Sequence, residues 1–234
     1  MSHFAVVISC EHAVDTVPEQ YRPLFASFNP LLASHRGIDF GALTIAEYLA
    51  KQIPSDFIQA TSTRLLIDCN RNIKHSDCFS EVTRNLSVEE KQHIIDNYYW
   101  PFRHQTMAKI KQHIENGSQV LHLSIHSFTP IFNGVTRNAD IGLLYDPRRI
   151  SEKIFATRWK AELKKLAPEY KIRMNYPYKG ISDGFTSMMR KGYTATQYIG
   201  IELESNQAIT LDDKKIVGLK KNFADSLLKL IYSS

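Results

Sequence analysis

The chain has 234 residues, of which 43% are hydrophobic and 23% are charged, and its formal net charge is +5. This balance is typical of a soluble protein with a sizeable core, organised as one large domain or two small ones. The three cysteines show no paired spacing, which argues against a disulfide scaffold and fits a reducing compartment. The charges are spread along the chain, so we expect no nucleic-acid site, whereas a mildly positive protein suits a small anionic ligand.

The N-terminal residues lack the features of a targeting segment. No basic region precedes the first apolar run, and that run, residues 4–9, is too short for a signal peptide or a membrane span. We therefore expect a cytoplasmic protein that does not bind a membrane. The sequence leaves the oligomeric state open.

Apolar, strand-like runs alternate with amphipathic helices along the whole chain. This alternation predicts an α/β fold of three layers, in which a mixed, mostly parallel sheet is flanked by helices. The expected strands cover residues 4–9, 57–60, 65–67, 120–125, 141–145, 171–175 and 198–203.

Four helices are expected between these strands. The longest starts at Ser87, where Glu90 completes a capping box, and Pro101 should kink or split it. Residues 175–187 are rich in Gly, Pro, Asn and Asp and too long for a simple connector, so we expect a functional loop there. The expected helices cover residues 39–53, 87–116, 149–166 and 211–232.

Ligand-type residues follow several of the apolar runs. His12, His126 and Glu202 each come within a few residues of the end of such a run. Because ligands of open parallel sheets bind at the carboxyl ends of the strands, these side chains should share one edge. A catalytic zinc needs three protein ligands from His and carboxylates. We predict that His12, Asp39 and His126 bind the metal, with Asp15 as the competing third ligand.

Glutamates at the end of the last run suit proton transfer. We expect Glu202, which directly follows the apolar residues 198–201, to face the site as general base, and Glu204 to point away. Asn70 and Arg71 are expected to bind a substrate carboxylate, since Arg offers a bidentate fork and Asn a further hydrogen bond.

Two weaker candidates complete the set. Arg64 and Arg137 are further cations that could bind an anionic substrate. Ser127 follows His126 but lacks the GxSxG elbow of a serine hydrolase, so a serine nucleophile is disfavoured.

The motifs that carry these residues resemble the N-formylglutamate amidohydrolase family. They are SCEHAVDTVP, HRGIDFGALTIAEYLA, TSTRLLIDCNR, LHLSIHSFTP, NADIGLLYDP, NYPYKGISDG and GIELESNQ, together spanning roughly residues 5–210. The resemblance implies one domain over residues 1–234, a zinc-carboxypeptidase-like fold and a zinc-dependent amide hydrolase. It also implies metal ligands at His12, Asp39 and His126, a catalytic glutamate at Glu202, and carboxylate recognition by Asn70 and Arg71.

Two positions depart from the pattern of the family. Asp15 replaces the usual asparagine, which adds a carboxylate near the expected metal, and Glu204 replaces an arginine. The resemblance therefore implies the fold and the metal chemistry more firmly than the substrate.

The expected activity is hydrolysis of a small anionic N-acyl amino acid, with N-formyl-L-glutamate as the first candidate and formate and glutamate as products. One alternative is a peptidase or muramoyl-amidase-like zinc hydrolase of a larger amide. Another is a non-catalytic binding protein stabilised by a metal, although a structural zinc site usually contains cysteines.

Overall fold

The structure, a computed structural model, describes residues 4–232 and is built round a six-stranded sheet. The strand order is β2-β1-β3-β8-β6-β7. The first four of these strands are parallel, whereas β6 and β7 run in the opposite direction. The predicted mixed, mostly parallel sheet is therefore confirmed. Its strands are β1 (Phe4–Cys10), β2 (Ser55–Gln59), β3 (Gln119–Phe128), β6 (Ile141–Leu144), β7 (Ile172–Met174) and β8 (Tyr198–Asn206).

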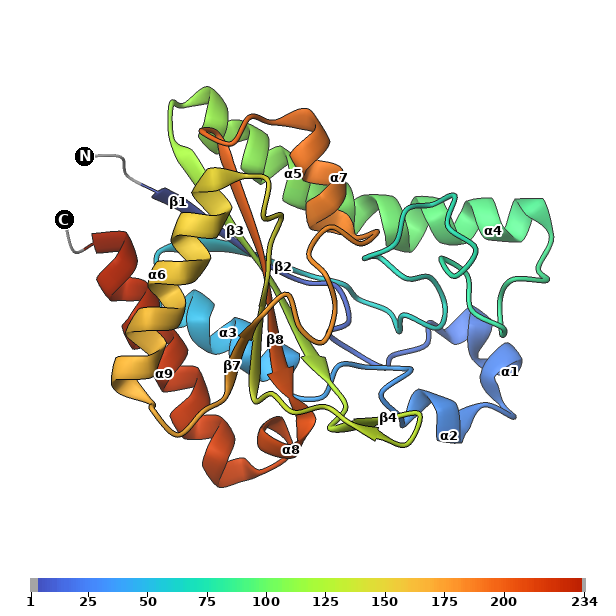
Figure 1. The fold of residues 1–234 in the computed structure, drawn as a ribbon. Coiled ribbons are helices and arrows are strands. Elements are labelled where there is room, and N and C mark those ends of the chain that lie inside the picture. Colours follow the sequence, from blue (N-terminus) through green and yellow to red (C-terminus); the bar gives the residue numbers. More distant parts are fainter. Residues whose placement is uncertain (1–3, 233–234) are drawn as a thin grey trace.

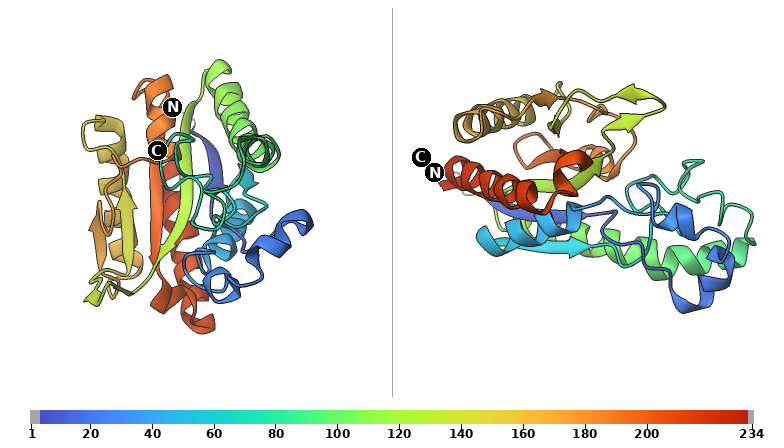
Figure 2. Two further views of the ribbon diagram at one scale, coloured as in Figure 1. Left: turned by 90° about the vertical axis from the view of Figure 1, so that its right-hand side faces the viewer. Right: turned by 90° about the horizontal axis from the view of Figure 1, so that it is seen from below.

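Helices cover both faces of this sheet, which gives the predicted three layers (Figure 1). One hydrophobic core joins the sheet to α3 (Ala42–Gln52), α6 (Ile150–Leu166) and α9 (Asp213–Tyr232). A second core joins the opposite face to α4 (Val88–Ile94), α5 (Trp100–Glu115) and α7 (Phe185–Gly192). The view from below in Figure 2 accordingly places α9 and α5 on opposite sides of the central strands.

The expected strand at residues 65–67 was wrong. Leu65 and Leu66 lie in a turn, in which the amide of Leu66 donates to the carbonyl of Thr63, and Ile67 follows without regular structure. None of the three pairs with a strand among the described residues. Their side chains are buried in the second core. The apolar run therefore reflects burial and not strand pairing, which periodicity alone does not separate.

The long predicted helix begins as expected and is divided as expected. The Ser87 side chain accepts from the Glu90 amide and the Glu90 carboxylate accepts from the Ser87 amide, which confirms the capping box. A π-helical turn, η2 (Ile95–Tyr99), then separates α4 from α5. Pro101 lies in the first turn of α5, and because it has no amide hydrogen it cannot bond to the preceding turn.

Short elements and irregular segments gather beyond the carboxyl ends of β1, β2 and β3 (Figures 1 and 2). The short elements are η1 (Glu19–Tyr21), α1 (Arg22–Phe25), α2 (Asn29–Leu32), the hairpin of β4 (Ile131–Phe132) and β5 (Val135–Thr136), and α8 (Gln207–Thr210).

Among residues 4–232, no helix is both long enough and apolar enough to cross a membrane.

Candidate metal centre and active site

A pocket of about 350 Å³ lies at the carboxyl ends of β1, β3 and β8. Its floor consists of strand-end residues, and its walls come from segments 64–71 and 178–183. The second of these segments belongs to the loop that the sequence singled out at residues 175–187. We call this cavity the metal pocket, because its floor holds a cluster of ligand-type side chains.

His12, Asp39 and His126 converge on this floor. Asp39 Oδ2 lies 3.2 Å from His12 Nδ1 and 3.0 Å from His126 Nδ1, and one ligand atom from each residue lies within 4.8 Å of the others. All three side chains are buried. The backbone fixes this arrangement, because the Asp39 amide donates to the His12 carbonyl at 3.1 Å before α3 begins. The structure thus brings together the three residues that the sequence proposed as metal ligands.

The outward nitrogen of each histidine has its own partner. His12 Nε2 lies 2.8 Å from Asp68 Oδ1, and His126 Nε2 lies 2.8 Å from Ser124 Oγ. Metal-binding histidines characteristically donate their second N–H to a carboxylate or another acceptor, which fixes the ring and its tautomer. The donor set and its supporting bonds therefore fit a zinc ion held by the two Nδ1 atoms and Asp39.

The electrostatics of the cluster favour positive charge at this point. Burial opposes a charged imidazole, but the hydrogen bond to Asp39 and the charge of Glu11 raise the pKa of His126 to about 10. Burial likewise opposes a charged carboxyl, yet the charge and hydrogen bond of His12 hold the pKa of Asp39 below its usual range. A site that stabilises a proton between a histidine and a carboxylate also suits a metal cation.

Glu11 supports this cluster from below, and the sequence analysis did not identify it. Its side chain is fully buried and accepts from Ser9 Oγ at 2.6 Å and from Ser124 Oγ at 2.9 Å. Both serine hydroxyls donate to this carboxyl group. The Ser124 oxygen must then accept from His126 Nε2–H, so Nδ1 is the nitrogen of His126 that can bind a metal, in exchange for its own proton.

The same chain of bonds continues away from the pocket. His122 Nε2 lies 2.8 Å from Ser9 Oγ, and His122 Nδ1 lies 2.7 Å from the Tyr198 hydroxyl. Burial lowers the pKa of His122 to about 4, so the ring is neutral and can donate to Ser9 while accepting from Tyr198. Every hydrogen in this chain therefore points toward Glu11. We call the chain of Tyr198, His122, Ser9, Glu11 and Ser124 the Glu11 relay.

Both glutamates of β8 line the metal pocket, so the prediction that Glu204 points away was wrong. Residues two apart on a strand share a face, and the two glutamates pair in register with Ser124 and His126 on β3. Glu202 Oε1 accepts a short hydrogen bond from the Thr186 hydroxyl. By contrast, Glu204 Oε2 is buried and has no hydrogen-bond partner among the described residues.

The surroundings of Glu204 suit a proton acceptor. Burial, together with the charges of Asp39 and Glu202, raises the pKa of Glu204 to about 7. A carboxyl that titrates near neutrality can take a proton from water and return it at working pH. Glu202, the residue predicted from sequence as the catalytic base, lies beside it, and its role stays a prediction.

Asn70 and Arg71 both line the pocket. Asn70 is held in place, because its Oδ1 accepts from the Phe185 amide at 2.8 Å. Arg71 donates to the Asp183 carbonyl at 3.1 Å. Within residues 4–232, no carboxylate lies within ion-pair distance of Arg71, which leaves its charge for a ligand.

The remaining candidates have other positions. Arg64 also lines the pocket, where it pairs with Asp39 of the metal cluster and with Asp68, the partner of His12. Arg137 is not among the residues that line the pocket, but it stacks on Phe132 and donates to the Tyr178 hydroxyl at 3.0 Å, and both of these residues line it. Its role in substrate binding stays a prediction. Asp15 is exposed and does not line the pocket, which corrects the expectation of an added carboxylate near the metal.

Comparisons with known proteins identify the family and the fold of the chain. A family model described as N-formylglutamate amidohydrolase matches residues 4–211. A search of curated proteins finds no match. The gene product Atu2144 from Agrobacterium tumefaciens is 23% identical in sequence and has a TM-score of 0.81, over 98% of this chain and 92% of that one. N-formylglutamate amidohydrolase from Ralstonia eutropha JMP134 is 17% identical, with a TM-score of 0.76 over 100% of this chain and 94% of that one. At these identities, the two structures show a shared fold.

Proposed function

Because the chain belongs to the N-formylglutamate amidohydrolase family, we propose that it is a zinc-dependent hydrolase of small N-acyl amino acids. N-formyl-L-glutamate is the substrate to test first. The observation that carries the proposal is the buried cluster of His12, Asp39 and His126 on the floor of a pocket of about 350 Å³. This volume is in the usual range for small-molecule sites.

The reaction is the addition of water across an amide. The acyl carbon gains the water oxygen, the C–N bond breaks, and the products are a carboxylic acid and an amine. A zinc ion bound by the two histidines and Asp39 would supply positive charge that polarises the amide and acidifies water.

The chain's own residues would perform the proton transfers and the positioning. Glu204, with its unpartnered buried oxygen, would take the proton from water and return it to the leaving nitrogen. Arg71 would bind a substrate carboxylate with its guanidinium, and Asn70 would orient the acyl group beside His126. The neighbouring Glu202 is the alternative base that the sequence favoured.

Formate release tests this proposal. The purified protein is depleted of metal with a chelator, titrated with zinc, and assayed on N-formyl-L-glutamate and on its α-amide and γ-amide. We expect activity to return in proportion to zinc and to be highest on the doubly charged substrate. Arg71→Lys keeps the charge but loses the fork, so KM should rise and kcat/KM should fall by roughly 10- to 150-fold. Equal rates on charged and amidated substrates would refute binding of a substrate carboxylate by Arg71. Rates that do not depend on zinc would refute the metal chemistry.

A further inference from the structure

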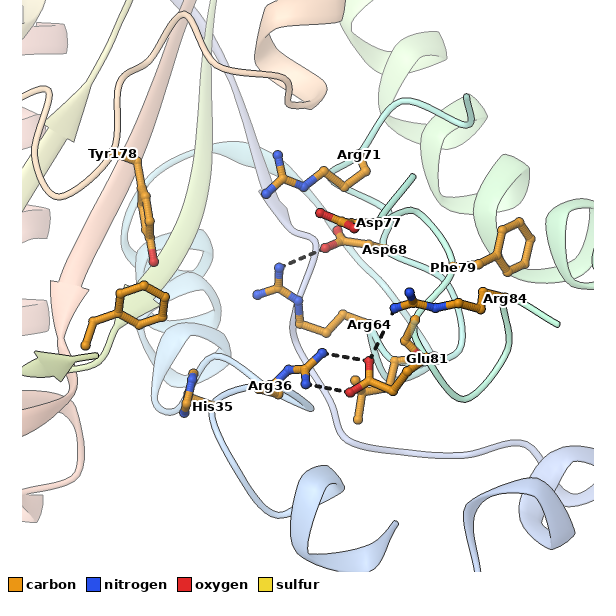
Figure 3. A pocket seen from close by; sticks show the side chains of 13 residues that line it. His35, Arg36, Arg64, Asp68, Arg71, Asp77, Phe79, Glu81, Arg84 and Tyr178 are labelled. Carbon is orange, nitrogen blue, oxygen red and sulfur yellow. Dashed lines mark hydrogen bonds and ion pairs between the residues drawn. The ribbon is translucent and has the colours of Figure 1, made fainter. Parts of the chain in front are cut away.

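A second cavity adjoins the metal pocket. It has a volume of about 370 Å³ and shares four lining residues with the metal pocket, namely Arg64, Arg71, Phe132 and Tyr178. The other lining residues come from three segments of the chain: His35 and Arg36 after α2, Leu65 and Asp68, and Asp77, Phe79, Ser80, Glu81 and Arg84. Figure 3 shows Tyr178 on one side of this cavity and the arginines on the other, with Arg71 at its upper end. A ligand longer than one amino acid could therefore extend from the metal pocket past Arg71.

The charges of this second cavity are not balanced. Four arginines and three carboxylates line it. Arg36 is held by Glu81 through two bonds of 2.5 and 2.7 Å, while Arg84 approaches the same carboxylate only at 3.9 Å, so this cluster keeps a positive charge. The side chain of Arg84 is 51% exposed. An exposed guanidinium whose nearest carboxylate already serves another arginine can turn to an anionic ligand.

Arg71 is the second cation whose charge is available. It lies at the junction of the two cavities and has no ion pair among residues 4–232. Of the three lining carboxylates, Asp68 pairs with Arg64 and Glu81 pairs with Arg36. Asp77 has no arginine within ion-pair distance among the described residues, and it is exposed to solvent. The cations therefore lie at the entrance from the metal pocket and at the far wall, in the order that an extended anion would meet them.

Resting on the proposed function, we propose that the second cavity binds a second acidic residue on the amine side of the scissile amide. The substrate class is then an N-acyl peptide that begins with two acidic residues. The first residue would lie in the metal pocket beside Arg71, and the carboxylates of the next would meet Arg84. The bond broken is still the acyl C–N bond, and water supplies the hydroxyl group of the acid and the hydrogen that the leaving nitrogen gains.

Substrates of different length and charge test this proposal. Formate release is measured on N-formyl-glutamate, N-formyl-glutamyl-glutamate and N-formyl-glutamyl-lysine. We expect the acidic dipeptide to be hydrolysed at least as efficiently as N-formyl-glutamate and about tenfold better than the lysine dipeptide, because a like charge in the cavity is repelled. In Arg84→Glu, the ratio of kcat/KM for the acidic dipeptide to that for N-formyl-glutamate should fall about tenfold. Arg158→Glu, an exposed position on α6, makes the same change in net charge and should leave the ratio unchanged.

A binding measurement separates this inference from the proposed function. Glutamate and glutamyl-glutamate, the expected amine products, are titrated calorimetrically into wild type and Arg84→Glu. We expect the dipeptide to bind more tightly than glutamate in wild type only. If N-formyl-glutamate is hydrolysed but the acidic dipeptide is rejected, the second cavity is not a substrate site and the proposed function stands. If no substrate releases formate, the proposed function fails, and equal dissociation constants for the two products would then overturn the second site as well.

Discussion

The two faces of the central strands differ in chemistry although both are buried. On β3, Leu121, Leu123 and Ile125 face the helices of the first core, as do Ile199, Ile201 and Leu203 on β8. The intervening residues of β3 face the other side, where Val120 packs in the second core and the next three are His122, Ser124 and His126. On this face of β3, the side chains change from apolar to polar toward the carboxyl end of the strand.

This difference shows how one sheet can provide both stability and a reactive site. The uniformly apolar face contributes transfer free energy and needs no partners. The polar face costs free energy unless each buried group is hydrogen-bonded, and the Glu11 relay supplies those bonds. Substitutions on the first face should therefore act on stability, and substitutions on the second on metal binding and catalysis.

Among substitutions on the polar face, removal of a metal ligand should have the largest effect on metal binding and activity. We expect His12→Ala and His126→Ala each to abolish stoichiometric zinc binding and with it the hydrolase activity, because three ligands are the minimum for a catalytic zinc. The measurement is the zinc content of each dialysed variant, determined by elemental mass spectrometry. Full zinc content in both variants would exclude this assignment.

The third ligand is tested in the same way. Asp39→Asn should lose zinc, whereas Asp15→Asn serves as the matched control, because Asp15 is exposed and does not line the pocket. Loss of zinc in Asp15→Asn with retention in Asp39→Asn would reverse the choice between the two.

The next largest effect should separate the two glutamates of β8. Glu204→Gln should lower kcat by roughly 100-fold or more, the range for a positioned general base, while zinc stays bound. Glu202→Gln should have a smaller effect, since Glu202 already accepts from Thr186. Zinc content and kcat are measured for both variants. If Glu202→Gln is the more severe change, the sequence prediction for the base is right and the assignment from the structure is wrong.

The sequence predicted the sheet better than it predicted the site. Apolar periodicity located six strands and the main helices, because burial of a helix face or a strand leaves a regular pattern. It failed at residues 65–67, where an apolar run is buried as a turn. His12, Asp39 and His126 could be proposed because each follows or precedes a clear element.

The supporting residues were harder to predict, because their roles depend on contacts between distant segments. Glu11 lies beside the predicted ligand His12, yet its partners Ser9 and Ser124 show its role only when β1 and β3 are paired. One signal was present in the sequence: His122, Ser124 and His126 alternate with apolar residues, which marks a strand with one polar face. The same period of two places Glu204 on the face of Glu202, so the wrong prediction that Glu204 points away could have been avoided from the sequence.

Two adjacent residues of β3 allow a direct comparison of the faces. Leu123→Ala should lower the free energy of unfolding by about 2–5 kcal/mol through a cavity in the first core, with little change in zinc affinity. Ser124→Ala removes the link between His126 and Glu11 and should weaken zinc binding by about 10-fold or more. Chemical denaturation and competition with a zinc-binding dye measure the two effects. Equal zinc affinity in both variants would contradict a role for the relay in orienting His126.

The smallest expected effect is a change in the pH dependence of stability through His122. Because burial lowers the pKa of His122 to about 4, the unfolded chain binds a proton at this position between pH 6.5 and 4 and the folded chain does not. Stability is therefore lost as the pH falls through this range, by about 3 kcal/mol in total.

His122→Gln cannot titrate, yet its amide can donate to Ser9 and accept from Tyr198 as the neutral ring does. We expect the free energy of unfolding of the wild type to fall by about 2–3 kcal/mol more than that of the variant between pH 7 and 4.5. The carboxylates that also titrate in acid are common to both proteins, so their contribution cancels in the difference. Parallel curves in urea denaturation would show that His122 is protonated in the fold, and the direction of hydrogen bonding along the Glu11 relay would then have to be revised.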